Sequence, residues 1–107
     1  MILKGTIDKI IAYAVHVTDP EEVILFGSMV KGTANVHSDV DLLIISESGI
    51  NRKEVTTRIK EYCHQRALKC DILIYSNSEL RKERDTPNSF VTAARKYGVI
   101  KYKKTSV

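Results

Sequence analysis

Residues 38–45 read Ser-Asp-Val-Asp-Leu-Leu-Ile-Ile, a segment in which two acidic residues lead into four apolar ones. Its apolar end is typical of a buried strand. Because side chains alternate across a strand, Asp39 and Asp41 project from one face, roughly 7 Å apart along the backbone. Carboxylates at the mouth of a buried strand are costly unless hydrogen bonds or a cation satisfy them. The pattern therefore favours a divalent metal site.

Two further apolar stretches carry polar residues at one end. Residues 23–28 read Val-Ile-Leu-Phe-Gly-Ser, and residues 70–75 read Cys-Asp-Ile-Leu-Ile-Tyr. Gly27 allows a sharp turn and a close approach of ligand to the backbone, and Ser28 begins a helical turn whose free N–H groups can hold phosphate oxygens. If its strand is a neighbour in the sheet, Asp71 lies close to the other two carboxylates. One of the three would then be free to act as a general base.

Apolar spacing and turn residues predict the remaining elements. We expect strands over residues 22–27, 39–46, 70–75 and 99–102. We expect helices over residues 2–16, 51–68 and 76–86, and another that begins at residue 88 or 89 and ends at residue 97. Between the first two strands we expect a helical turn at residues 29–31 and a loop at residues 33–38. Capping-box spacings mark two helix starts, Asn51 with Glu54 and Ser76 with Glu79. This order predicts an α/β (α+β) fold, a small mixed sheet covered by helices, in one domain spanning residues 1–107.

Composition narrows the class of protein. The 107 residues are 43% hydrophobic and 28% charged, with a formal net charge of +4. No apolar run approaches the roughly 20 residues needed to span a bilayer, and charges interrupt the N-terminal apolar positions, so we expect a cytoplasmic protein without a secretory signal. The basic residues gather in the last third but do not alternate with aromatic ones, which favours solvated helix faces over a nucleic-acid site.

The two cysteines, Cys63 and Cys70, are predicted to be free thiols packed in the core of a protein from a reducing compartment. Together with His64 they could be imagined as zinc ligands. Their spacing matches no standard zinc motif and a fourth ligand is missing, so core packing is the better account.

The combination of these motifs resembles a known family. Gly-Ser at residues 27–28, ten intervening residues and Asp-Val-Asp at residues 39–41 look like the signature of the polymerase-beta-type nucleotidyltransferase superfamily. Residues 25–32, Leu-Phe-Gly-Ser-Met-Val-Lys-Gly, are similar to the minimal nucleotidyltransferases of bacteria and archaea. The resemblance runs from about residue 20 to residue 75 and is specific through its combined spacing.

The resemblance implies a reaction in which an acceptor hydroxyl attacks the α-phosphorus of a nucleoside triphosphate, ATP being favoured, and pyrophosphate is released. It assigns nucleotide binding to Gly27, Ser28 and Lys31, and binding of Mg²⁺ and catalysis to Asp39, Asp41 and Asp71, with Asp71 as the base. Lys31 stands where the family often has arginine, so the charge is kept without a bidentate phosphate fork.

The resemblance also implies partners. Minimal nucleotidyltransferases are commonly paired with a small helical HEPN-type protein, often as the antitoxin of a ribonuclease toxin, and AMP would then pass to a hydroxyl of the partner or of a small molecule. A homodimer could complete the acceptor pocket equally well. The alternative is a non-catalytic antitoxin or regulatory subunit that acts by contact.

Each acidic residue taken alone also has a plainer interpretation. Asp39 could cap a loop, Asp41 could pair with a lysine, and Asp71 could be a solvated strand end. The joint pattern of the three residues favours the metal site.

Overall fold

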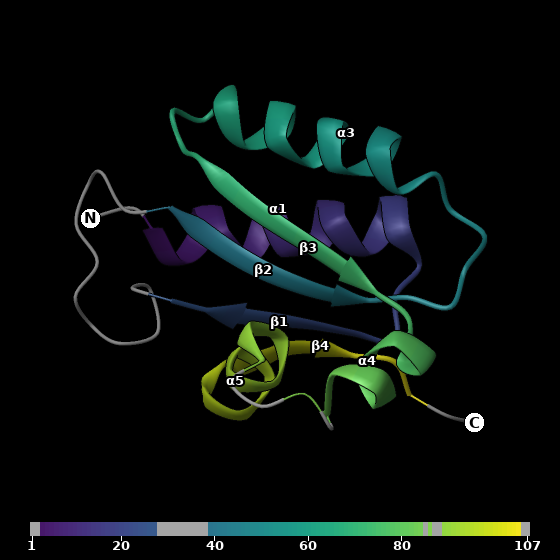
Figure 1. Ribbon diagram of the computed structural model, residues 1–107. Helices are drawn as coiled ribbons and strands as arrows, with labels where there is room; N and C mark the ends of the chain where they lie inside the picture. The colour runs from purple at the N-terminus through teal and green to yellow at the C-terminus, as the bar shows by residue number, and fades with distance from the viewer. Residues whose placement is uncertain (1–2, 28–38, 85, 87–88, 106–107) are drawn as a thin grey trace.

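The computed structural model describes residues 3–27, 39–84, 86 and 89–105 (Figure 1). Its elements are α1 (Leu3–Thr18), β1 (Glu22–Phe26), β2 (Val40–Ile45), α3 (Arg52–His64), β3 (Cys70–Tyr75), α4 (Asn77–Arg84), α5 (Phe90–Tyr97) and β4 (Val99–Lys103). Within these residues the predicted order of helices and strands is confirmed, and the largest boundary error is the end of α3, which stops at His64 rather than near residue 68. The helical turn and loop predicted between residues 29 and 38 lie outside the described residues.

The four strands form one mixed sheet in the order β3-β2-β1-β4, which confirms the predicted fold class. β1 is antiparallel to both β2 and β4, whereas β2 and β3 are parallel and joined by the crossover helix α3. In this register Asp41 lies opposite Phe26 on one side and Asp71 on the other. Residues opposite one another point to the same face, so all three side chains share one face of the sheet.

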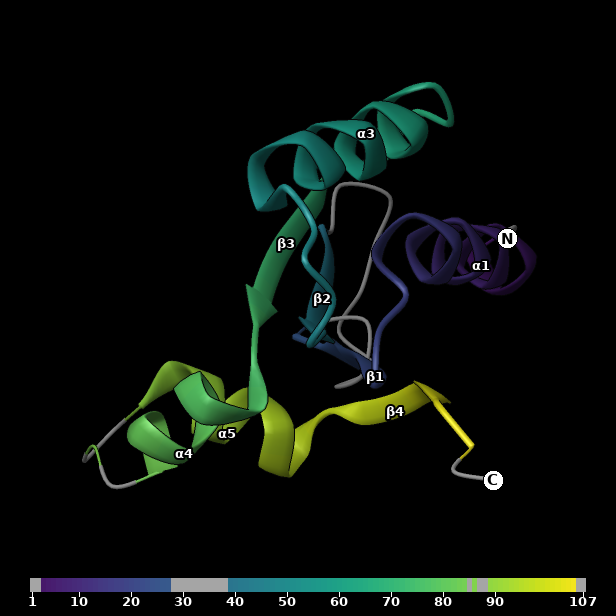
Figure 2. The ribbon, with the colours of Figure 1, turned by 90° about the vertical axis from the view of Figure 1, so that its right-hand side faces the viewer.

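The sheet lies between two groups of helices, as Figure 2 shows, and each group packs on it through apolar side chains. α1 and α3 cover one face, where residues such as Ile10, Leu42 and Ile59 are fully buried. α4 and α5 cover part of the other face, where Leu80 and Val91 pack on strand residues. The side chains of β2 alternate between these two faces, which explains why its apolar half is buried on both sides.

Side-chain caps fix where the helices begin. Asn51 Oδ1 accepts from Glu54 N at 3.0 Å, the N-cap half of the predicted capping box. The box at α4 is complete, because Ser76 Oγ accepts from Glu79 N at 3.2 Å and Glu79 Oε1 accepts from Ser76 N at 2.9 Å. Arg52 also donates to the Glu79 carboxylate, and this hydrogen bond, together with those from Ser76, lowers the pKa of Glu79 to about 2. The two helices are therefore tied together at the end of β3.

The prediction of free thiols is wrong. Cys63 and Cys70 form a disulfide with a Cα–Cα distance of 6.4 Å, which links the last turn of α3 to the first residue of β3. The reason is local: the helix ends early and the chain reverses through Ala67, whose φ of 59° is left-handed, so two residues seven apart come within disulfide reach. Neither sulfur is then free for zinc, and the inference of a reducing compartment loses its basis.

In the part of the chain that the structure describes, no helix combines the length and the apolar character that a membrane crossing requires.

Candidate active site

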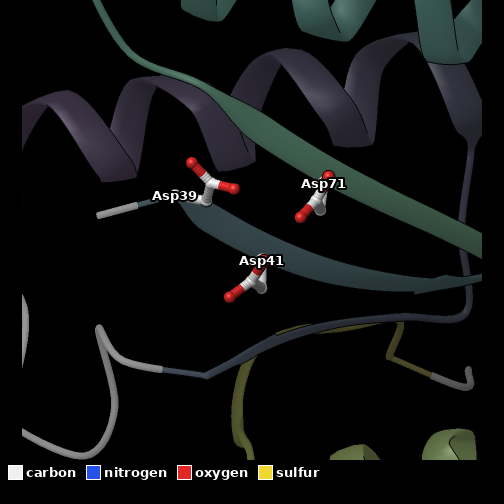
Figure 3. A group of neighbouring side chains, drawn as sticks. All are labelled: Asp39, Asp41 and Asp71. Atoms are coloured by element: carbon white, nitrogen blue, oxygen red, sulfur yellow. The ribbon is translucent and has the colours of Figure 1, made fainter. Parts of the chain in front are cut away.

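Three carboxylates converge at the start of the two parallel strands (Figure 3). Asp39 directly precedes β2, Asp41 is its second residue, and Asp71 is the second residue of β3. One carboxylate oxygen from each lies within 4.8 Å of the others. Asp39 and Asp41 are half-buried and Asp71 is exposed. The predicted convergence is confirmed, and the parallel register of β2 with β3 is its cause.

The electrostatics of this cluster are unfavourable without a cation. The pKa of Asp41 is raised to about 6, first by its burial and then by the negative charges of Asp71 and Asp39. At neutral pH the Asp41 carboxylate therefore carries its negative charge against burial and against the repulsion of its neighbours. A bound cation would offset the repulsion between the carboxylates, because each of them would then be stabilised by a neighbouring opposite charge.

Gly27 makes room for the Asp41 carboxylate. Its φ is +81°, a left-handed conformation that other residues adopt at a cost, and a Cβ at this position would overlap Asp41 Oδ2. The sequence predicted a glycine that lets a ligand approach the backbone. The structure adds a second reason, since the carboxylate itself occupies the space beside Gly27.

The donor set fits a hard divalent cation. Carboxylate oxygens are the ligands that Mg²⁺ prefers, and Mg²⁺ usually takes one or two from the protein while phosphates and water complete its shell. Ion pairs among the described residues join Arg52 with Glu79, Arg58 with Glu54, Arg95 with Glu22 and Lys104 with Asp19. None of these uses the three acids, so in this part of the chain the alternative of an Asp41–lysine pair has no support.

Two of the predicted nucleotide-binding residues, Ser28 and Lys31, lie outside the described residues, so their placement remains a prediction. Sequence reasoning also passed over Phe26, which is opposite Asp41 and whose ring packs edge-on against Phe90 with the centroids 5.5 Å apart. The available signal was its position directly before Gly27, at the end of the strand that leads into the site.

Comparisons with known proteins agree with this geometry. The profile of the "Nucleotidyltransferase domain" family matches residues 7–105. No curated protein sequence matches significantly. Among solved structures, a crystal structure of a toxin–antitoxin with AMP-PNP is similar with a TM-score of 0.63 at 14% identity, over 92% of this chain and 74% of that one. A Sulfolobus solfataricus protein, provisionally assigned as a nucleotidyltransferase, gives a TM-score of 0.59 at 20% identity, over 94% and 79%.

At these identities the two structures show a shared fold and nothing finer. The family profile is stronger evidence because it spans nearly the whole chain, including both parallel strands and the three acids. The protein is therefore a member of the nucleotidyltransferase domain family, and nucleotidyl transfer is its class of reaction.

Proposed function

We propose that this single domain, residues 1–107, is a magnesium-dependent nucleotidyltransferase that transfers AMP from ATP to a hydroxyl group of a protein or small molecule. The observation that carries the proposal is the approach of three carboxylates from β2 and β3 to within 4.8 Å. Membership of the family supports the reaction class. A bound cation would offset the repulsion from Asp71 and Asp39, which together with burial raises the pKa of Asp41.

Asp39, Asp41 and Asp71 would hold Mg²⁺, which when bound would neutralise charge on the phosphates. Gly27 and Ser28 would place backbone and hydroxyl donors against the triphosphate, and Lys31 would add a positive charge. Holding both reactants in one geometry would supply much of the rate enhancement. Asp71 is exposed, so an incoming acceptor could reach its carboxylate.

In the proposed step, the acceptor hydroxyl oxygen forms a bond to the α-phosphorus. The bond from that phosphorus to the oxygen bridging to the β-phosphorus breaks, and pyrophosphate leaves with its electron pair. The hydroxyl proton passes to the Asp71 carboxylate, which acts as the general base.

A partner protein is the favoured source of the acceptor. One structural neighbour is a toxin–antitoxin solved with AMP-PNP, and we extend that context to this chain by proposing that it is the antitoxin of a small helical HEPN-type toxin. The edge strand β4 supports an interface, since Val99 and Ile100 are each about half exposed. A homodimer formed through the same edge is the competing arrangement. We keep the cytoplasm as the proposed location, although the Cys63–Cys70 disulfide does not support it.

The test is transfer of label from ATP labelled at the α-phosphate, with Mg²⁺, in the presence and absence of the candidate helical partner. We expect label on the partner with the wild type, and a loss of at least about a hundredfold with Asp39→Asn or Asp41→Asn, since each removes a charged ligand. Glu54→Gln is the matched control, because Glu54 is an exposed acid on α3 and outside the cluster.

Label transfer that persists in both aspartate variants would contradict the proposed site. Tight binding of the partner with no transfer from any nucleoside triphosphate would instead support the non-catalytic antitoxin or regulatory subunit.

A further inference from the structure

One aromatic side chain on the active-site face of the sheet is unusually bare. Phe90, the first residue of α5, is 63% exposed. Its ring meets the ring of Phe26 edge-on, with the centroids 5.5 Å apart and an interplanar angle of 75°. This contact is a favourable aromatic geometry, but it leaves most of the Phe90 ring surface open to solvent. The exposed face of this ring is therefore open for another planar group to stack on.

The ring is attached to a well-anchored helix. Val91 and Ala94 of α5 are buried against the sheet. Ser89 caps the helix by accepting from Thr92 N at 3.3 Å, and its hydroxyl donates to Glu83 Oε2 at 2.8 Å. These contacts fix the start of α5, so Phe90 is presented in a defined place without having to order on binding.

The position of Phe90 relative to the acids follows from the strand register. Phe26 lies directly opposite Asp41, on the same face of the sheet. Opposite residues in an antiparallel pair have Cβ atoms about 5 Å apart, so Phe26 has Asp41 as one neighbour and the Phe90 ring as another. Phe26 also leads directly into Gly27, where the triphosphate is expected.

We propose that Phe90 forms the wall against which the nucleobase of the triphosphate stacks. The inference rests on the proposed function and adds the recognition of the base. With the α-phosphate at the carboxylates, the nucleoside extends along this face past the buried Phe26, and its base stacks on the exposed ring of Phe90. Stacking on an aromatic ring uses the π-face that every base has, and a larger face stacks better. The site therefore favours purine over pyrimidine nucleotides by stacking.

The experiment compares two ligands by calorimetry, with Mg²⁺ present and without acceptor: ATP, and inorganic tripolyphosphate, which has the phosphates but no base. Phe90→Ala should weaken ATP binding about tenfold and leave tripolyphosphate binding unchanged, because only the base touches the ring. Phe90→Trp should restore ATP binding. For the wild type, ATP and GTP should bind more tightly than CTP and UTP.

Tyr97→Ala is the matched control. Tyr97 is 69% exposed on the same helix, two turns from Phe90. The Tyr97→Ala variant should bind ATP as tightly as the wild type. This result would show that the effect of Phe90→Ala comes from a contact at Phe90 and not from a general loss of exposed aromatic surface.

The outcomes that overturn the proposal differ from those that overturn the proposed function. If Phe90→Ala binds ATP as tightly as the wild type, or loses affinity for ATP and tripolyphosphate alike, the stacking role is wrong while nucleotidyl transfer stands. If the wild-type protein binds neither ligand and transfers no label, both proposals fail.

Discussion

Two residues, Gly27 and Asp41, show how single atoms shape the site. The Asp41 carboxylate occupies the space where any other residue at position 27 would place its Cβ, and the backbone of Gly27 has a left-handed φ. Asp41 in turn is held where burial and two neighbouring charges oppose its ionisation. The local structure therefore places an acid where it costs stability, which is typical of functional sites.

Gly27→Ala should destabilise the protein by about 1–2 kcal/mol and abolish nucleotidyl transfer, because the methyl group strains the backbone and displaces Asp41. The measurement is urea unfolding together with the labelled-ATP assay. Gly5→Ala is the matched control, because a Cβ at this position of α1 meets nothing within 4 Å. Alanine favours the helix over glycine, so this substitution should raise the free energy of unfolding by at most about 1 kcal/mol. Equal effects of the two substitutions would refute this explanation.

Asp41→Asn should change how stability depends on pH. The folded-state pKa of Asp41 is raised from 3.8 to about 6, so its contribution to stability is fully present below pH 3.8 and is lost as the pH rises to about 6. The full pKa shift corresponds to a change of about 3 kcal/mol in the free energy of unfolding. Solvent screening at a partly exposed carboxyl reduces the expected change to about 1 kcal/mol.

Urea unfolding with EDTA at pH 4.0 and pH 7.5 checks this prediction. Relative to the wild type, the free energy of unfolding of Asp41→Asn should gain about 1 kcal/mol between the two pH values. Asp8→Asn, at an exposed position of α1 outside the cluster, is the control and should show a smaller change. A constant difference between wild type and Asp41→Asn would show that Asp41 does not titrate in this range.

At the scale of elements, β3 combines a covalent link with a site residue. Cys70 is bonded to Cys63 at the end of α3, and the next residue along the strand is Asp71. The same strand ends beside Arg52, which donates to Ile74 O at 3.1 Å and pairs with Glu79 of α4. Helix α3 is therefore tied to both ends of β3, which fixes the strand against β2.

Reduction of the Cys63–Cys70 disulfide should lower the free energy of unfolding by about 2 kcal/mol, the loop-closure entropy of a short bridged segment. Urea unfolding with and without a phosphine reductant measures this difference. The double variant Cys63→Ala/Cys70→Ala should not respond to the reductant. If the unfolded, unreduced wild type reacts with a maleimide at both cysteines, the two thiols are free and the prediction fails.

For the whole molecule, assembly of the site depends on the completed sheet. Asp41 and Asp71 are thirty positions apart in the sequence and become neighbours only when α3 packs and β3 pairs in parallel with β2. A cation bound by these acids therefore binds the folded state far better than the unfolded chain. Folding and cation binding should be thermodynamically linked.

Mg²⁺ or Mn²⁺ should accordingly raise the melting temperature of the wild type, since a ligand at a hundred times its Kd adds about 2.7 kcal/mol. Asp39→Asn and Asp71→Asn should lose most of this shift, whereas Glu54→Gln should keep it. The measurement is thermal unfolding at pH 7.5 over a series of cation concentrations. A shift of equal size in all four proteins would mean that the cation binds elsewhere.

The strands, most helix starts and the three candidate acids could be predicted from the sequence, because alternation, capping and the spacing from Gly27 to Asp41 are local properties of the chain. The structure was needed to show that Asp71 joins the other two acids and that Phe90 contacts Phe26. Strand register and helix packing bring these distant segments together, and no local pattern encodes them. The structure was also needed for the Cys63–Cys70 bond, because that bond depends on an early end of α3 that the apolar spacing did not predict.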